Sequence, residues 1–360
     1  MDMNYRYSNK LSTDGNRMIP QDNHITGKIV YPTVDWGIMT EREEMISFGP
    51  VPSRRLGRSL GVNNIPPKKC TYSCIYCQLG RTNEFALRRL NYYGPERIFD
   101  DVGRRVDCLE KMDEKIDYIA FVPDGEPTLD KDLGLEISKV KELGYPVAVI
   151  TNSSLLPDIE VREELAMADW VSLKVDAASE EAWRSVNRPN EKLVLEELID
   201  GILLFKDEFN GTLCTETMLV SELNDTPVVL EATSDLITDI SPSRAYLSIP
   251  IRPPAEGWAL PPDAEHIILA LTIFMERGLK SEMLTSVGEG RFSLAGDIET
   301  EILRITSVHP MDKRSLGDLL KTAHRDWTLV DEMMDRGELI SLKLGNEVFY
   351  MRNLDTHAGK

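Results

Sequence analysis

The chain has 360 residues, of which 42% are hydrophobic and 28% are charged, a composition that excludes a wholly disordered protein and a length that allows roughly two domains. Its formal net charge of -19 argues against a protein that coats nucleic acid through bulk electrostatics. No apolar run approaches the ~18–20 residues of a membrane span, and the charged N-terminus lacks the apolar stretch of a signal peptide, so we expect a cytoplasmic protein that does not contact membranes.

Residues 1–45 are polar and aperiodic, which predicts a flexible N-terminal extension. From residue 46 onward, short runs of branched apolar residues alternate with helix-like stretches, and strands separated by helices pair in parallel through right-handed crossovers. The predicted strands are residues 59–65, 118–122, 147–151, 170–175, 213–220 and 245–251. Residues 46–294 are therefore predicted to form an α/β domain, a partial (β/α)6-type TIM barrel, with its chemistry at the C-terminal ends of the strands.

Residues 295–360 follow a different pattern. Three short helix-like stretches precede two strand-like ones, 339–343 and 347–352, which flank the hairpin turn Gly345-Asn346. This order predicts a small winged-helix-like domain. Because residues 297–360 hold 9 basic against 12 acidic side chains, packing or protein docking is at least as plausible a role for this domain as reading nucleic acid.

The five cysteines include three within eight residues, Cys70, Cys74 and Cys77, in the spacing C-x3-C-x2-C. Such crowding does not suit a disulfide framework, and thiolates select zinc or iron–sulfur clusters. No further Cys or His follows until Cys108, so a fourth zinc ligand is missing nearby. Three thiolates on a cubane cluster leave one iron open for a substrate, which indicates catalysis; the alternative is that the three thiols pack or bind zinc. Cys108 and Cys214 read as buried or incidental thiols.

With the aromatic Tyr76 just before the last cysteine, this motif resembles the signature of the radical S-adenosylmethionine (SAM) superfamily. The resemblance implies that Cys70, Cys74 and Cys77 hold a [4Fe-4S] cluster whose open iron binds the amino and carboxylate groups of SAM. It also implies that a low-potential donor of the ferredoxin or flavodoxin type reduces the cluster. Reductive cleavage of SAM then yields methionine and a 5′-deoxyadenosyl radical, which abstracts a hydrogen atom from the substrate.

The motif Asp124-Gly125-Glu126-Pro127 follows the predicted strand 118–122 and resembles the family's Gly-Gly-Glu motif, with Asp124 in place of the first glycine. The resemblance implies that Gly125 and Glu126 engage the amino group of SAM. Asn152, at the end of strand 147–151, resembles the strand end that faces the cofactor in the family.

Ser172, Lys174 and Asp176 alternate along one strand and therefore share one face of it. Apolar residues separate them, so this face is predicted to turn toward a polar lumen. The resemblance implies that this strand end contacts the ribose or carboxylate of SAM. The structural alternative for Lys174 and Asp176 is an ion pair.

Residues 48–64 and 78–82 resemble the opening of the wyosine-synthase-like, tRNA-modification-related subgroup. Residues 48–90 also carry eight basic side chains against one acidic one, which favours an anionic partner such as tRNA unless these bases pair with acids elsewhere. Three hypotheses follow: a radical SAM enzyme that acts on a tRNA nucleoside or another anionic substrate, one that modifies a protein or peptide docked by the C-terminal domain, and a non-enzymatic iron–sulfur regulator.

Overall fold

The computed structural model of the chain describes residues 46–284, 297–344 and 347–353. The predicted N-terminal extension, residues 1–45, and the predicted turn Gly345-Asn346 lie outside the described residues. Residues Glu44–Lys360 form one compact unit. Within the described segments, no helix combines the length and the apolarity needed to cross a bilayer.

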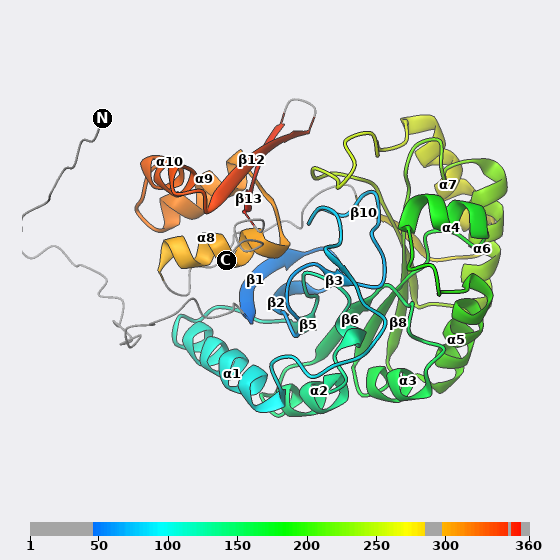
Figure 1. Cartoon of the computed structure of the whole chain (residues 1–360), viewed down its shortest axis with the longest axis horizontal. Helices are drawn as coiled ribbons and strands as arrows, with labels where there is room; N and C mark the ends of the chain where they lie inside the picture. Colours follow the sequence, from blue (N-terminus) through cyan, green and yellow to red (C-terminus); the bar gives the residue numbers. More distant parts are fainter. Residues whose placement is uncertain (1–45, 285–296, 345–346, 354–360) are drawn as a thin grey trace, which may run out of the picture. The chain divides into compact units, whose positions relative to one another are not determined.

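A curled eight-stranded sheet, in the order β1-β2-β5-β6-β7-β8-β9-β10, forms the centre of this unit (Figure 1). The edge strand β1 (Ser47–Ser53) pairs antiparallel with β2 (Gly57–Val62), and every later pair of neighbours is parallel. The other strands are β5 (Tyr118–Phe121), β6 (Val147–Thr151), β7 (Trp170–Lys174), β8 (Thr212–Met218), β9 (Arg244–Ser248) and β10 (Ser281–Leu284). The predicted α/β half-barrel is confirmed, with β1 and the parallel strand β10 in addition to the six predicted strands.

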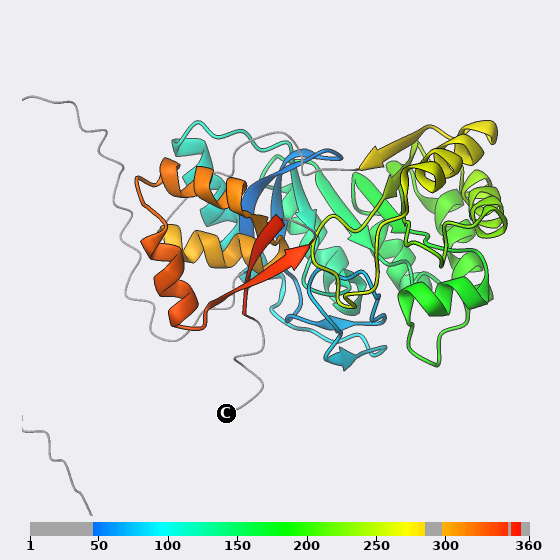
Figure 2. The same cartoon turned by 90° about the horizontal axis from the view of Figure 1, so that it is seen from above.

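Helices cover the convex face of the sheet in both views (Figures 1 and 2). They are α1 (Pro95–Lys111), α2 (Leu133–Lys141), α3 (Ile159–Leu165), α4 (Glu180–Asn187), α5 (Leu195–Glu208), α6 (Pro227–Ile240) and α7 (Ala264–Glu276). Alternation along the strands sends Phe121, Val149 and Leu173 to the core beneath these helices. Trp170 and Tyr246 belong to a separate cluster on the opposite face of the sheet, toward the half-barrel lumen.

The C-terminal residues build a second core of their own around Ile302, Leu316 and Val330. Its elements are α8 (Ile298–Val308), β11 (Met311–Asp312), α9 (Lys313–Thr322), α10 (Thr328–Asp335), β12 (Leu339–Leu344) and β13 (Glu347–Arg352). The three helices and two long strands appear in the predicted order. The two-residue strand β11 was not predicted; it pairs with β13 and completes a three-stranded antiparallel sheet.

A buried ion pair fastens this C-terminal part to the barrel. Arg105 of α1 pairs with Glu301 of α8, and their side chains are only 2% and 1% exposed. The Arg105 guanidinium also donates to the carbonyl oxygen of Gly49 in β1, 3.0 Å from Nε. Because both charges are shielded from water and satisfied by each other, the contact holds α8 in a fixed place against β1.

Two interacting carboxyl groups, those of Asp130 and Glu136, are both fully buried. Among the described residues, Asp130 Oδ2 and Glu136 Oε1 have no hydrogen-bond partner, although Asn64 Nδ2 donates to the other Glu136 oxygen at 3.3 Å. Burial, followed by repulsion from Asp130, raises the pKa of Glu136. One proton shared between the two carboxyl groups would satisfy both unpaired oxygens.

Replacing Glu136 by Gln is therefore expected to change how stability depends on pH. A carboxyl group whose pKa is raised on folding stabilises the fold fully below its unfolded value of about 4.3, and this stabilisation is lost as the pH rises through the folded value. The amide of Gln needs no proton to donate, so the stability of Glu136→Gln relative to the native protein should rise by up to about 1.4 kcal/mol per pH unit between pH 5 and pH 9. Urea unfolding across this range measures the difference. Parallel curves would contradict the shared proton, and the exposed Glu142→Gln is the control.

Candidate active site

The three clustered cysteines lie in the segment that follows β2. Cys70 ends the short strand β3 (Lys69–Cys70), and Cys74 and Cys77 lie in the loop after it. All three are free thiols of intermediate exposure. Backbone bonds within the loop (Cys77 N–H to Cys74 O, 3.1 Å) and to the end of α4 (Ile75 N–H to Val186 O, 3.0 Å) fix its course. Burial raises the pKa of each thiol, to about 12 for Cys74, and a nearby carboxylate adds to the rise in each case: Glu126 for Cys70, Asp176 for Cys74 and Asp124 for Cys77.

The thiols suit a polynuclear centre better than a single ion. In the segments that the structure describes, no three His, Cys, Asp or Glu side chains converge where they could share one metal ion. Cysteines that hold a cubane cluster bind different iron atoms, so their sulfur atoms need not converge on one point. The donor set of three thiols in one loop therefore fits a [4Fe-4S] cluster, whose binding would displace the thiol protons.

Gly125 brings the loop after β5 into contact with the cysteine loop. The Glu126 N–H donates to the carbonyl oxygen of Lys69 at 3.1 Å, one residue before Cys70. A Cβ atom at Gly125 would lie 1.9 Å from the same oxygen, so any larger residue would separate the two loops. The structure thus places Gly125 and Glu126 beside the cysteine loop.

The Glu126 carboxylate ties the ends of β5 and β6 together. It is 1% exposed and accepts hydrogen bonds from the Asn152 N–H (2.7 Å), from the hydroxyl of Thr151, and from the hydroxyl of Thr128 (2.7 Å) and its N–H (3.2 Å). Burial raises the pKa of Glu126, and these donors oppose the rise. The donors hold the carboxylate in one orientation.

Asn152 connects the end of β6 to the first cysteine. Its Nδ2 donates to Thr71 Oγ1 at 2.7 Å and lies 3.5 Å from Cys70 Sγ. An amide donor to a ligating sulfur would stabilise the thiolate form. The sequence motif indicated a position facing the cofactor, but it did not indicate this contact with the sulfur.

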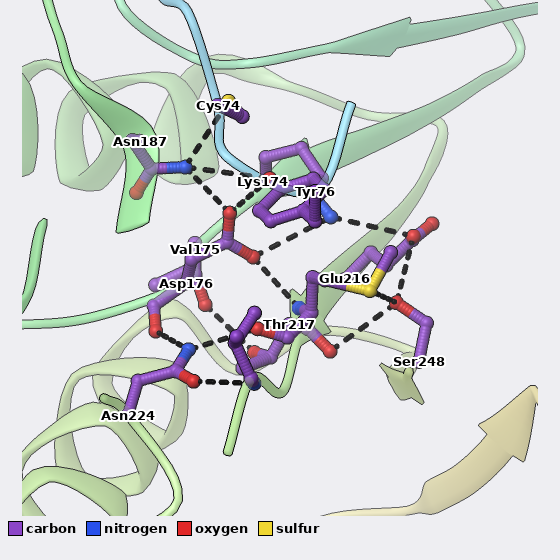
Figure 3. A network of polar contacts seen from close by, with 12 residues as sticks. Cys74, Tyr76, Lys174, Val175, Asp176, Asn187, Glu216, Thr217, Asn224 and Ser248 are labelled. Carbon is purple, nitrogen blue, oxygen red and sulfur yellow. Dashed lines mark hydrogen bonds and ion pairs between the residues drawn. The ribbon is translucent and has the colours of Figure 1, made fainter. Parts of the chain in front are cut away.

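Asp176 lies at the centre of a buried network of polar contacts (Figure 3). Its carboxylate accepts hydrogen bonds from the hydroxyl of Tyr76, from Asn187 Nδ2 at 2.6 Å and from the Met218 N–H at 2.7 Å. Asn187 Nδ2 also lies 3.5 Å from Cys74 Sγ. Asp176 therefore orders both the aromatic residue of the cysteine motif and the amide beside the second cysteine.

Lys174 extends this network toward the lumen. Its Nζ lies 3.4 Å from both Asp176 Oδ1 and Glu216 Oε1, and 4.9 Å from the centre of the Tyr76 ring. The ion pair considered as a structural alternative is thus present. Glu216 was not singled out in the sequence; it also pairs with Arg55. Its alternation with Cys214 and Met218 along β8 was the signal that could have identified it.

Ser172 lies deeper on the same strand face. It pairs in register with Ile150 and Cys214, which both belong to the lumen cluster. Ser172 is 1% exposed, and its hydroxyl has no hydrogen-bond partner among the described residues. The predicted alternation is therefore present. Of the three polar residues, Lys174 is the one that lines a cavity at the C-terminal ends of the strands.

A cavity of about 390 Å³ opens at the C-terminal ends of the strands. Tyr76, Cys77 and Gly125 form the side next to the cysteine loop, while Ser248 stands at the end of β9. His309, at the C-terminal end of α8, also lines it, so the C-terminal part of the chain contributes to the wall.

The basic stretch at residues 48–90 is largely neutralised. Five of its eight basic side chains form ion pairs with acids: Arg55 with Glu216, Arg58 with Glu114, Lys69 with Glu84, Arg81 with Glu256 and Arg89 with Glu164. The sequence left two interpretations of this stretch open, an anionic partner and pairing with acids elsewhere in the chain. For these five side chains the structure shows pairing with acids.

Comparisons with known proteins show what this chain is similar to. The family model described as the radical SAM superfamily matches residues 64–230. A UPF0026 protein of Methanocaldococcus jannaschii is 42% identical over 311 residues, covering 86% of this chain and 96% of that protein. A UPF0026 protein of Synechocystis sp. is 35% identical over 212 residues, covering 57% of this chain and 76% of that protein.

Among solved structures, a radical SAM methyltransferase from Sphaerobacter thermophilus is 16% identical with a TM-score of 0.48, covering 64% of this chain and 67% of that one. A structure of TYW1 with a lysine-pyruvate adduct bound is 17% identical with a TM-score of 0.49, covering 61% and 73%.

Proposed function

Because the chain belongs to the UPF0026 family of the radical SAM superfamily, we propose that Cys70, Cys74 and Cys77 hold a [4Fe-4S] cluster and that SAM binds beside it in the cavity. The protein is a radical SAM enzyme. One observation carries the proposal: the three-thiol loop, the Gly125–Glu126 loop and the cavity meet at the C-terminal ends of the parallel strands. The bound cluster would supply the electron that cleaves SAM to a 5′-deoxyadenosyl radical, which takes a hydrogen atom from the substrate.

The chain's own residues would hold and orient SAM. Glu126 and the backbone at Gly125 would accept hydrogen bonds from its ammonium group, because a carboxylate fixed by other donors still offers lone pairs. Lys174, on the cavity wall, would attract its carboxylate, with Asp176 and Tyr76 holding the lysine in place. Asn152 and Ser172, assigned to the same cofactor site from sequence, would support it from behind the wall.

Glu126→Gln is expected to weaken SAM binding while leaving the cluster in place. The substitution keeps an acceptor and the side-chain shape but removes the charge, and a hydrogen bond to a charged group contributes about 1.5–3 kcal/mol, on the order of 10–100-fold in Kd. Equilibrium binding of SAM to the reconstituted protein measures this change. Thr128→Val, which removes one donor to the same carboxylate, is the control and should bind SAM nearly as the native protein does. Unchanged affinity in Glu126→Gln would remove Glu126 from the site.

For the substrate we propose a tRNA nucleoside, supported by the resemblance of residues 48–64 and 78–82 to the wyosine-synthase-like subgroup. A protein or peptide is the second candidate, favoured by the pairing of most basic side chains in residues 48–90. The C-terminal part, which we propose is a winged-helix-like domain, would dock that partner. A ferredoxin or flavodoxin would supply the electron. Superfamily membership leaves a non-enzymatic regulator without support.

Mass spectrometry of tRNA nucleosides and of tryptic peptides, from cells with and without the gene, tests this choice. A nucleoside that disappears with the gene would support the tRNA proposal. A modified peptide that disappears, with the nucleosides unchanged, would replace it with the protein substrate. Binding of bulk tRNA at low salt gives a second check, because phosphate contacts weaken steeply as salt rises.

A further inference from the structure

Arg252, in the segment after β9, joins three parts of the chain at the cavity wall. Its Nη1 donates to Gln78 Oε1 at 2.9 Å, and its Nη2 lies 2.6 Å from His309 Nε2. Gln78 directly follows Cys77, and His309 ends α8. Burial and the charge of Arg252 lower the pKa of His309 well below its usual value, so both partners are neutral.

The charge of Arg252 is therefore not balanced by these contacts. In the described part of the chain, no carboxylate lies within ion-pair distance of its guanidinium, and its Nε is buried without a hydrogen-bond partner. Burial, followed by repulsion from Arg55 and opposed by the charge of Asp312, lowers the pKa of Arg252 to about 10, which leaves it charged at neutral pH. A guanidinium has five N–H donors, and buried polar groups rarely lack partners, so this one has donors to spare for a ligand.

Basic side chains outnumber carboxylates among the residues that line the cavity, although the chain carries a net charge of -19. Among the described residues that line it, the basic side chains are Arg54, Arg55, Lys174 and Arg252, and the one carboxylate is Glu216. Glu216 already contacts Arg55 and Lys174. SAM combines a sulfonium and an ammonium group with a single carboxylate, so it brings no net negative charge to this wall. Lys174 also contacts Asp176, whereas Arg252 has no carboxylate at ion-pair distance among the described residues, so the charge of Arg252 is the one that points to a second, anionic molecule.

We propose that Arg252, supported by Gln78 and His309, forms an anion subsite that binds a carboxylate or phosphate group of the substrate. The proposal rests on the proposed function and adds the substrate class to it. An arginine held by two neutral partners keeps its planar fork oriented and its charge available, which suits both of these anions. Because Gln78 adjoins Cys77, an anion bound here would place the substrate next to the cysteine loop. His309 and Gln78 act as positioning residues.

Titration calorimetry of the reconstituted, SAM-loaded protein with pyrophosphate and with citrate, at constant ionic strength, tests the subsite. We expect one of the two anions to bind the native protein, which also separates a phosphate from a carboxylate substrate. Arg252→Gln should weaken that binding about tenfold or more, and Arg252→Lys, which keeps the charge without the fork, should fall between. The exposed Arg314→Gln, outside the cavity, is the control and should bind the anion as the native protein does.

Equal binding of the anion to the native protein and to Arg252→Gln, or no binding of either anion to the native protein, would overturn the subsite. The Kd for SAM, measured on the same variant, identifies the occupant. A Kd within about twofold of the native value supports a substrate anion, whereas a loss of about tenfold would assign Arg252 to the carboxylate of SAM and overturn the proposal. Failure of the native protein to release 5′-deoxyadenosine would refute the proposed function without affecting the anion measurement.

Discussion

Cys74→Ala is expected to abolish both the visible absorption of a reconstituted iron–sulfur cluster and the release of 5′-deoxyadenosine from SAM. Each thiol of the loop would hold a different iron, so the loss of one leaves an iron without its protein ligand. Anaerobic reconstitution, followed by iron and sulfide analysis and chromatography of the SAM products, measures both effects. Retained cleavage of SAM would contradict the cluster assignment.

Cys108→Ala is the matched control for this experiment. Cys108 lies in α1, outside the cysteine loop, and is also a partly exposed cysteine. Its replacement should leave the iron content and the cleavage of SAM as in the native protein. A cluster lost from both variants would indicate non-specific iron binding and would also contradict the assignment.

Arg105→Met is expected to cause the largest loss of stability of the substitutions considered. It keeps most of the side-chain volume but removes the nearest partner of Glu301, which is 1% exposed between the barrel and α8; the other basic neighbour, Arg304, lies 3.9 Å from Glu301 Oε1. Leaving one partner of a buried ion pair uncompensated costs about 3–5 kcal/mol, and the longer contact with Arg304 makes this an upper limit for the loss. Urea unfolding, followed by circular dichroism, measures the loss.

Two further variants identify the cause of that loss. The double variant Arg105→Met/Glu301→Leu removes both charges and should recover most of the stability, because no buried charge is left unpaired. Arg336→Met removes an exposed pair with Glu299 in the same C-terminal part and should leave stability nearly unchanged. A double variant as unstable as Arg105→Met would show that packing, and not charge, accounts for the effect.

Most of the barrel could be predicted from sequence because its strands are apolar runs separated by amphipathic helices. The strands that were missed lack that pattern. β1 contains two prolines, which an edge strand tolerates but which argue against a strand in sequence. β10 has four residues and β11 has two, and both depend on neighbours far along the chain for their pairing. Such short segments carry almost no periodicity.

The candidate site was predictable where one motif supplies several groups, as in the cysteine loop, or where strand ends bring motifs together, as for Gly125 and Asn152. It was not predictable where the groups come from distant segments. Arg55 meets Glu216 across 161 positions of sequence, so a local count of charges overestimated the free basic surface. His309 reaches the cavity only because α8 packs against β1, a contact that no local pattern encodes.

The role of the three thiols is tested most directly on the anaerobically reconstituted native protein. Its iron and sulfide contents are measured, and 5′-deoxyadenosine is assayed after incubation with SAM and a strong reductant. We predict about four iron and four sulfide ions per chain and the release of 5′-deoxyadenosine. Zinc in place of iron, or an iron–sulfur protein that leaves SAM intact, would contradict the assignment.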